Sequence, residues 1–163
     1  MKNQTPSDSP FYDRVVHTLG LLRVMEAVRA AEGDAPIGNL YSVYGQHIHQ
    51  QKDAKLDPST ALREAGLSTS YAAAFDDSSW DAIIRTTMDE GLALTGNDVG
   101  TPLLAIDSKD GPVGFFGPVI SRRMALDESL QLWDGVVATT TIPGFWELKR
   151  TRTESPNFDP PSP

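Results

Sequence analysis

Hydrophobic residues in the first 95 positions recur at steps of three and four, which predicts a series of amphipathic helices. The first helix is expected to begin at Ser9 and Pro10, because serine caps helix N-termini and proline is favoured at the first helical position. Gly33 is expected to end this helix. Its apolar stripe consists of Phe11, Val15, Leu19, Leu22 and Met25.

Further helices are predicted along the same part of the chain. One opens at residues 34–36, and a polar connector, residues 52–55, leads to another that restarts at residues 57–59 and stops at Gly66. Ser68 is expected to cap a short turn, which is followed by a longer helix from about Trp80 to Leu94. The apolar face of the helix after residue 36 is formed by Ile37, Leu40, Tyr41, Tyr44 and Ile48.

The periodicity changes after Thr95. Residues 103–106 and 113–116 are short apolar runs on either side of a turn-rich segment, and this pattern predicts a β-hairpin. Helical spacing then returns, and both Trp133 and Trp146 are interpreted as core anchors on helical apolar stripes. The apolar residues that restore this spacing are Leu126, Leu130, Trp133 and Val137.

These patterns divide the chain into four regions. Residues 1–9 are polar and expected to be disordered, and residues 10–95 form a helical domain. Residues 96–153 form a strand–strand–helix region. The proline-rich residues 154–163 are expected to be extended.

The composition excludes several classes of function. A chain of 163 residues with 39% hydrophobic content suits one domain of ordinary size. Its net charge of −8 argues against a nucleic-acid surface, and the basic group at Lys149, Arg150 and Arg152 is interpreted as a solvated helix end. No stretch approaches the roughly 20 apolar residues of a membrane helix and the first ten residues are polar, so no membrane partner and a cytoplasmic location are expected.

The sequence offers no catalytic or metal-ligating residue of its own. It contains no cysteine, which excludes a thiolate nucleophile or ligand within these residues. His47 and His49 point about 200° apart on a helix, so one metal ion cannot easily take both. The acidic pairs at residues 76–77 and 127–128 stand at predicted helix starts, where capping is the better interpretation. Nucleophile-elbow and phosphate-cradling glycine motifs are absent.

Three segments in the last third of the chain carry a family resemblance. Residues 99–106 form a Gly-Thr-Pro loop with an apolar strand, residues 114–119 read Gly-Phe-Phe-Gly-Pro-Val, and residues 145–153 begin Phe-Trp-Glu-Leu. Together they resemble the DsbA-like branch of the thioredoxin superfamily and, within it, the mycothiol-dependent nitroreductase and disulfide reductase family. The resemblance implies an α/β fold that is mostly helical overall. In it, a DsbA-like helical domain, residues 10–95, precedes the C-terminal half (strand–strand–helix) of a thioredoxin fold, residues 96–153.

The resemblance also implies a reaction. The family reduces disulfides or nitro compounds with a small thiol, and mycothiol is a co-substrate rather than a bound cofactor. The family's Cys-Pro-Trp-Cys type motif, which lies near its N-terminus, has no match in this chain. The chain is therefore expected to be a truncated member that lacks the first strand, the cysteine-bearing helix and the second strand, and to be inactive as it stands, because disulfide exchange needs a thiolate.

The same resemblance implies candidate ligand-binding residues. Thr101 and Pro102 match the family's cis X-Pro element, in which the residue before proline offers backbone hydrogen bonds to the substrate. Gly100, Thr101 and Pro102 are therefore expected to form what remains of the substrate-binding wall. Tyr44 and His49 are expected to line a pocket, because in the family the helical block overhangs the active site. A polar residue at the edge of a helix interface is the competing interpretation of His49.

Two kinds of partner remain open. The resemblance implies a small thiol or a disulfide-bearing ligand. The alternative is a non-catalytic binding protein that completes a partner chain, such as a separate N-terminal half, or associates with itself. The outer edge of the strand at residues 103–106 motivates this alternative, because two strands alone are marginal in water and an open apolar edge invites pairing.

Overall fold

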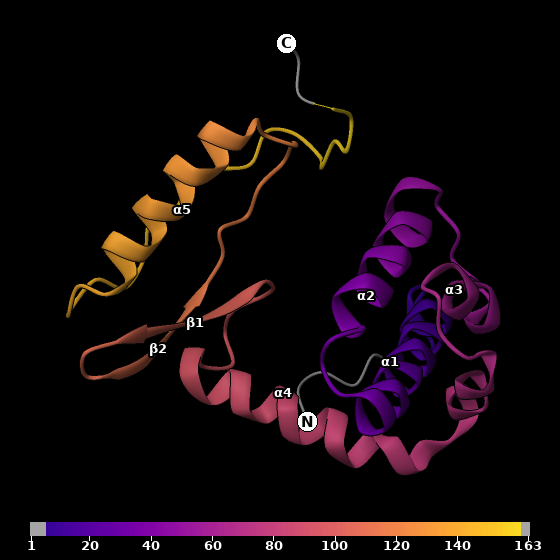
Figure 1. Cartoon of the computed structure of the whole chain (residues 1–163). Coiled ribbons are helices and arrows are strands. Elements are labelled where there is room, and N and C mark those ends of the chain that lie inside the picture. The colour runs from indigo at the N-terminus through magenta and orange to yellow at the C-terminus, as the bar shows by residue number, and fades with distance from the viewer. Residues whose placement is uncertain (1–5, 161–163) are drawn as a thin grey trace. The chain divides into compact units, whose positions relative to one another are not determined.

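The computed structural model describes residues 6–160, which fall into two compact units. The first unit ends at residue 86 and the second begins at residue 87, so the boundary lies inside the helix α4 (Asp81–Thr95). Figure 1 shows the helices of the first unit and the hairpin and helix of the second. The domain limits expected from the sequence stay a prediction.

The regular elements of the first unit are all helices over its described residues, and loops connect them. Each helix predicted from the sequence is present, with ends that differ by a few residues. The elements are α1 (Tyr12–Glu32), α2 (Ile37–Gly45), a π-helix η1 (Gln46–Gln50), α3 (Pro58–Glu64), two 3₁₀ helices η2 (Thr69–Asp76) and η3 (Ser78–Trp80), and the start of α4.

The start of α1 differs from the prediction. The N-cap of α1 is Phe11, and no side chain caps the helix. The Ser9 hydroxyl accepts a hydrogen bond from the Phe11 N–H at 3.2 Å, and the Ser9 carbonyl accepts one from Tyr12 at 3.0 Å. Ser9 therefore closes a turn ahead of the helix instead of capping it. The predicted end is confirmed, because the Gly33 N–H donates to the Arg29 carbonyl at 2.9 Å.

The core of the first unit lies against the C-terminal half of α1. Here the predicted apolar stripe is wrong, because Phe11, Val15 and Leu22 are exposed and only Met25 of that set is buried. The helix period predicts only which residues of α1 share a face. Which face is buried depends on where α2, α3 and η2 pack against it. Tyr41 is exposed for the same reason. The core consists of Leu21, Val24, Met25, Ala27, Val28, Leu40, Tyr44, Leu56, Ala61, Leu62 and Ala74.

A hydrogen-bonded ion pair fixes the start of α4 to α1. The Arg23 guanidinium donates to both carboxylate oxygens of Asp81, at 2.7 and 3.0 Å, and to the Phe75 carbonyl at 3.1 Å. The hydrogen bond from Arg23 holds the pKa of the Asp81 carboxyl below its usual value. Asp81 is the first residue of α4, so this contact sets where that helix begins on the core.

Acidic residues at other helix starts behave as caps only in part. Asp77 accepts a hydrogen bond from the Ser79 N–H at 2.9 Å and caps η3, which confirms the capping interpretation there. In the second unit, Glu128 instead forms an ion pair with Arg122.

The second unit contains the predicted β-hairpin. Strands β1 (Leu103–Ser108) and β2 (Gly111–Phe116) form an antiparallel sheet of two strands, with Leu103 opposite Phe116 and Ser108 opposite Gly111. Residues 109–110 make the turn. The helix α5 (Leu126–Thr140) follows, which confirms the return of helical spacing.

The end of α4 packs closely on one face of the hairpin. Gly114 lies directly opposite Ala105 and shares its face, and Leu103 lies two residues before Ala105, so Leu103 and Gly114 point to the same side. A Cβ atom at Gly114 would lie 2.5 Å from the Leu94 Cβ and 2.6 Å from its carbonyl oxygen, so only glycine fits there. On the opposite face, the Phe115 ring stacks on the Phe145 ring, with 5.8 Å between the ring centroids.

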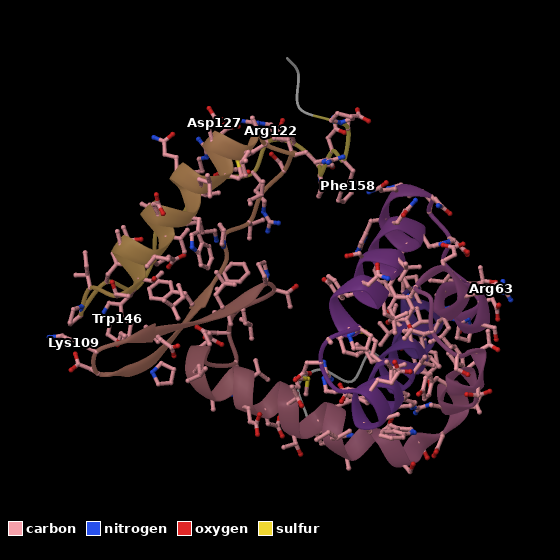
Figure 2. All side chains as sticks on the ribbon, viewed as in Figure 1. Arg63, Lys109, Arg122, Asp127, Trp146 and Phe158 are labelled. Carbon is pink, nitrogen blue, oxygen red and sulfur yellow. The ribbon has the colours of Figure 1, made fainter. Side chains whose placement is uncertain are left out.

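The expectation for the tryptophans was wrong. Trp146 lies in a segment without regular structure and is 85% exposed (Figure 2), and Trp133 on α5 is also exposed. Helical spacing alone cannot show whether another element covers a stripe. Lys149 and Arg150 likewise follow no helix. The tail is held rather than merely extended, because the Asn157 N–H donates to the Ser121 carbonyl at 2.6 Å.

No helix within residues 6–160 is long and apolar enough to cross a bilayer.

The ion pair of Arg23 and Asp81 is expected to stabilise the first unit measurably. Arg23→Ala should lower the free energy of unfolding by about 1–3 kcal/mol, because it leaves a partly buried carboxylate without its donors. The matched control is Arg63→Ala, which removes an exposed arginine of α3 that forms no ion pair within residues 6–160, and a loss below about 1 kcal/mol is expected. Urea unfolding followed by circular dichroism gives both values, and equal losses would contradict the assignment.

The same pair should make stability depend on pH in a defined direction. The pKa of Asp81 is lowered in the folded chain, so its stabilising contribution is complete above the unfolded value of about 3.9 and is lost as the pH falls through the folded value. The difference in unfolding free energy between the parent chain and Arg23→Ala should therefore shrink on acidification below about pH 4. A difference that grows in acid would contradict this.

Candidate functional site

The loop of Gly100, Thr101 and Pro102 joins α4 to β1 in the second unit. All three residues are exposed. The Thr101–Pro102 peptide bond is cis, and so is Gly117–Pro118 just after β2, which the sequence analysis did not anticipate. The two X-Pro elements lie side by side, since the Gly117 N–H donates to the Pro102 carbonyl at 2.8 Å.

This hydrogen bond determines which residues of β1 form hydrogen bonds with β2; we call this the phase of the hairpin ladder. In an antiparallel pair, residues alternate between those that bond across to the partner strand and those whose N–H and C=O point away from it. Pro102 bonds across to Gly117, so Leu104 and Ile106 must also bond across to β2. The two-residue turn gives the same phase, because it makes Ser108 and Gly111 the closing bonded pair.

The alternate residues of β1 therefore present their backbone groups to the open edge of the strand. These residues are Leu103, Ala105 and Asp107, and Thr101 continues the series into the loop. Neither the N–H nor the C=O of Thr101 has a hydrogen-bond partner among residues 6–160. We call the part of this row nearest the loop, Thr101, Leu103 and Ala105, the open edge of β1. It offers donors and acceptors at the spacing that an added extended chain requires.

An apolar ring lies beside the loop end of the open edge. A Cβ atom at Gly100 would lie 3.4 Å from the Phe116 ring, so that ring, which is partly exposed, lies beside the loop. Gly100, Thr101 and Pro102 carry neither an acid nor a base. The arrangement can bind an extended ligand, and these three residues supply no thiolate and no titratable side chain.

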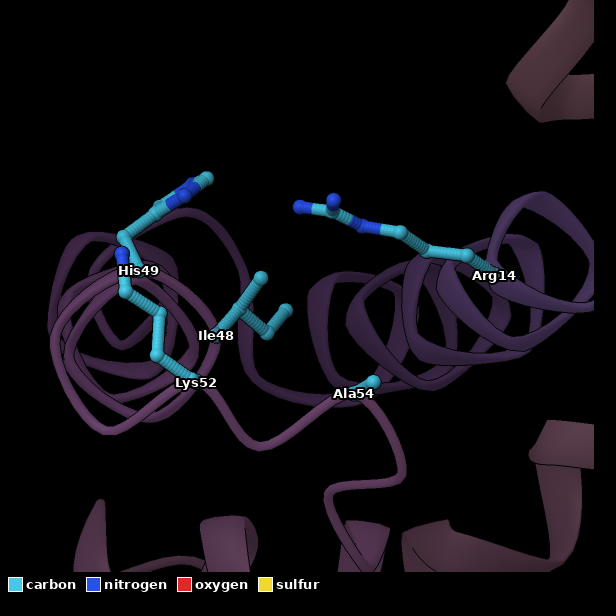
Figure 3. A pocket seen from close by; sticks show the side chains of 5 residues that line it. All are labelled: Arg14, Ile48, His49, Lys52 and Ala54. Carbon is cyan, nitrogen blue, oxygen red and sulfur yellow. The ribbon is translucent and has the colours of Figure 1, made fainter. Parts of the chain in front are cut away.

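Tyr44 and His49 lie in the first unit, and the structure does not bring them to one pocket. Tyr44 is 5% exposed and belongs to the core, where its hydroxyl donates to the Leu21 carbonyl at 3.3 Å. Burial raises the pKa of the Tyr44 hydroxyl far above its ordinary value. His49 is exposed and lines a hollow with residues from α1 and from the connector after η1 (Figure 3). A groove shared by Tyr44, His49 and Thr101 stays a prediction.

The structure gives no metal site within the part of the chain that it describes. No group of three His, Asp or Glu side chains between residues 6 and 160 is arranged to hold an ion. His47 instead pairs with Glu64, with 2.8 Å between the imidazole Nε2 and the carboxylate Oε2.

Sequence reasoning missed two features. The first is the hydrogen bond from Gly117 to Pro102; its only indication in the sequence is the Gly117-Pro118 dipeptide that follows the second apolar run. The hollow at His49 includes Arg14, which lies 35 positions earlier in the chain, and no local pattern links the two.

The fold and the comparisons together define the class of protein. A mostly helical chain with a two-stranded antiparallel sheet is compatible with an α/β, thioredoxin-like fold. The model of the Rv2466c-like family, described as mycothiol-dependent nitroreductase Rv2466c, matches residues 4–150. Because this match spans most of the 163 residues, the chain belongs to the Rv2466c-like, mycothiol-dependent nitroreductase family.

The ladder phase predicts an alternating pattern of amide exchange along β1. The amides of Leu104 and Ile106 should be protected, because they donate to β2, and those of Leu103 and Ala105 should exchange fast, because they face the open edge. Hydrogen exchange of the ¹⁵N-labelled full chain in dilute solution measures all four. Protection of Leu103 and Ala105 instead would show that the phase is wrong.

Proposed function

We propose that this chain serves the reaction of its family, the thiol-dependent reduction of nitro compounds or disulfides, by binding the thiol-bearing ligand along the open edge of β1. The family match supports the thiol and the reaction. The observation that carries the binding role is the pair of Thr101 backbone groups, which have no partner among the described residues. We further propose the DsbA-like arrangement, with the Thr101–Pro102 loop as its substrate-facing element.

The binding step rests on backbone groups rather than on side chains. An extended ligand that lies along β1 forms hydrogen bonds with Thr101 and Leu103, as in strand addition. Phe116, whose ring lies beside Gly100, supplies an apolar contact next to those bonds. Such a site recognises the backbone-like part of a small thiol or of its disulfide, and it leaves the sulfur free to react.

The redox step needs a group that these residues do not provide. In exchange chemistry a thiolate attacks one sulfur of the disulfide, a mixed disulfide forms, and the other sulfur leaves as a thiolate. The 163 residues contain no cysteine, so we propose that they do not turn over substrate by themselves. The attacking thiolate would come from a partner chain or from a segment outside these residues. Use of a reduced thiol favours a reducing compartment, which we propose to be the cytoplasm.

The proposal predicts binding without turnover. Reduction of a model disulfide by mycothiol or dithiothreitol should proceed at the rate without protein when the 163-residue chain is added, because no enzymic thiolate is present. An absorbance assay of thiol release measures this. A rate well above that of the reagents alone would overturn the claim of inactivity.

Binding is measured separately on the same sample. Titration of the ¹⁵N-labelled chain with millimolar mycothiol or its disulfide should shift the amides of Gly100, Thr101 and Leu103. Thr101→Ala is the matched control, since it keeps both backbone groups and should retain the shifts within about twofold in Kd. Absence of any shift in the parent chain would overturn the binding role.

A second candidate function is that of an interaction protein that completes a partner chain or pairs with itself. The open edge of β1 favours it, because an unpaired strand edge is a template for another strand. We propose that the partner supplies a strand, a cysteine-bearing helix and a second strand. Exposed apolar side chains of the second unit would be covered in such a complex: Leu126, Leu130, Trp133, Trp146 and Leu148.

This second candidate predicts that the isolated chain self-associates. Its mass by light scattering should rise with concentration, since two strands alone are marginal in water. Ala105→Lys, which places a charge beside the open edge, should lower the association constant by about tenfold. The matched control, Ala73→Lys, adds the same charge to an exposed position of the first unit and should change it little. A sharply melting monomer at all concentrations would contradict this candidate.

A further inference from the structure

The first unit contains a hollow that the thiol chemistry does not use. It has a volume of about 190 Å³ and lies between α1 and the segment from η1 to the connector after it. Figure 3 shows Arg14 and His49 directed towards each other from opposite sides, with Ile48 between them. The lining residues are Arg14, Ile48, His49, Lys52 and Ala54.

The charge of this hollow is unusual for the chain. Two permanent cations, Arg14 and Lys52, line it together with one imidazole, and no carboxylate does, although the whole chain carries a net charge of −8. Neither Arg14 nor Lys52 forms a salt bridge with any residue between 6 and 160. Three arginines of the chain are paired with carboxylates instead: Arg23 with Asp81, Arg29 with Glu26 and Asp34, and Arg122 with Glu128.

The backbone of Lys52 gives a second, independent sign that this position is constrained. Lys52 is the one non-glycine residue with positive φ, 61°, in the described part of the chain. Such a conformation costs energy for a lysine and persists where the surrounding structure imposes it. The flanking residues do so here, because the Gln51 N–H donates to the Gln46 carbonyl and the Asp53 N–H donates to the His47 carbonyl, both at 3.0 Å.

The carboxylates nearest in sequence do not neutralise the two cations. Asp53 follows Lys52, but its carboxylate accepts a hydrogen bond from the Lys55 N–H at 2.9 Å and does not line the hollow. Asp13 precedes Arg14 on α1 and does not line it either. Two like charges beside one hollow repel each other, and a bound anion would relieve that repulsion.

We propose that this hollow binds a small organic carboxylate. The planar guanidinium of Arg14 matches the two oxygens of a carboxylate and can donate to both, whereas the ammonium of Lys52 adds a second positive charge. Ile48 and Ala54 contact the apolar body of the ligand. A volume of about 190 Å³ is smaller than the roughly 300–1,000 Å³ of sites for drug-sized ligands, so the ligand is a small monocarboxylate.

The site is tested with sodium benzoate as the probe. Titration of the ¹⁵N-labelled full chain should shift the amides of Ile48, His49, Lys52 and Ala54, with saturation in the millimolar range. Benzyl alcohol has the same ring without the charge and should leave these amides unchanged. Sodium phosphate is the third arm, and it should bind more weakly than benzoate, because its tetrahedral oxygens and lack of an apolar body suit this lining less.

Variants separate a specific site from a general effect of charge. Arg14→Ala should weaken benzoate binding by about tenfold or more, and Arg14→Lys, which keeps the charge but loses the planar fork, should weaken it by about threefold. Arg63→Ala is the matched control: it removes one exposed cation from α3 (Figure 2) that does not line the hollow, and it should change Kd less than about twofold. Circular dichroism checks that each variant is folded.

Three results would overturn the proposal. The first is the absence of shifts at about 50 mM benzoate, where even a weak site fills. The second is equal weakening by Arg14→Ala and Arg63→Ala, which would reveal non-specific attraction. The third is binding of phosphate as tight as that of benzoate. The hollow makes no use of the open edge of β1, so its failure would leave the proposed thiol function untouched.

Discussion

The hydrogen bond from the Gly117 N–H to the Pro102 carbonyl is the contact on which the candidate site depends. It ties the loop before β1 to the exit of β2, and by alternation it decides which backbone groups of β1 are consumed by the hairpin. A shift of one residue would bond Thr101, Leu103 and Ala105 to β2 and would turn Pro102, which has no N–H to donate, towards the open edge. Gly117 has a φ of +104°, a conformation that other residues rarely adopt, so the glycine is required by this geometry.

A different element covers each face of the hairpin, so the open edge of β1 is where a ligand can bind. Gly114 lets the end of α4 approach one face so closely that a methyl group would meet the Leu94 backbone. The Phe115 ring on the opposite face is covered by Phe145. A two-stranded sheet held in this manner gains its order from the helix and the stacked ring rather than from its own ladder. Its edge is therefore preformed without being paired.

Much of the secondary structure follows from local chemistry, and it was predictable for that reason. Asp57 caps α3 and Gly33 ends α1, because both residues act through bonds to their own neighbours in sequence. The buried side of α1 and the exposure of Trp146 were not predictable, since both depend on which other elements lie nearby. The two candidate ligand sites differ in the same way: the Thr101–Pro102 loop carries a local motif, whereas Arg14 and Lys52 line one hollow only once α1 and the connector are packed.

The two candidate ligand sites use opposite kinds of interaction. The open edge of β1 binds through neutral backbone groups, which recognise the shape of an extended chain and carry no net charge. The hollow at Arg14 and Lys52 binds through two cations at an exposed surface, where the attraction for an anion is screened by salt over a Debye length of about 8 Å at physiological ionic strength. Added salt therefore weakens the second site and spares the first. A ligand that carries both an extended amide and a carboxylate would bind each site by a different part, and ionic strength would show which part was bound.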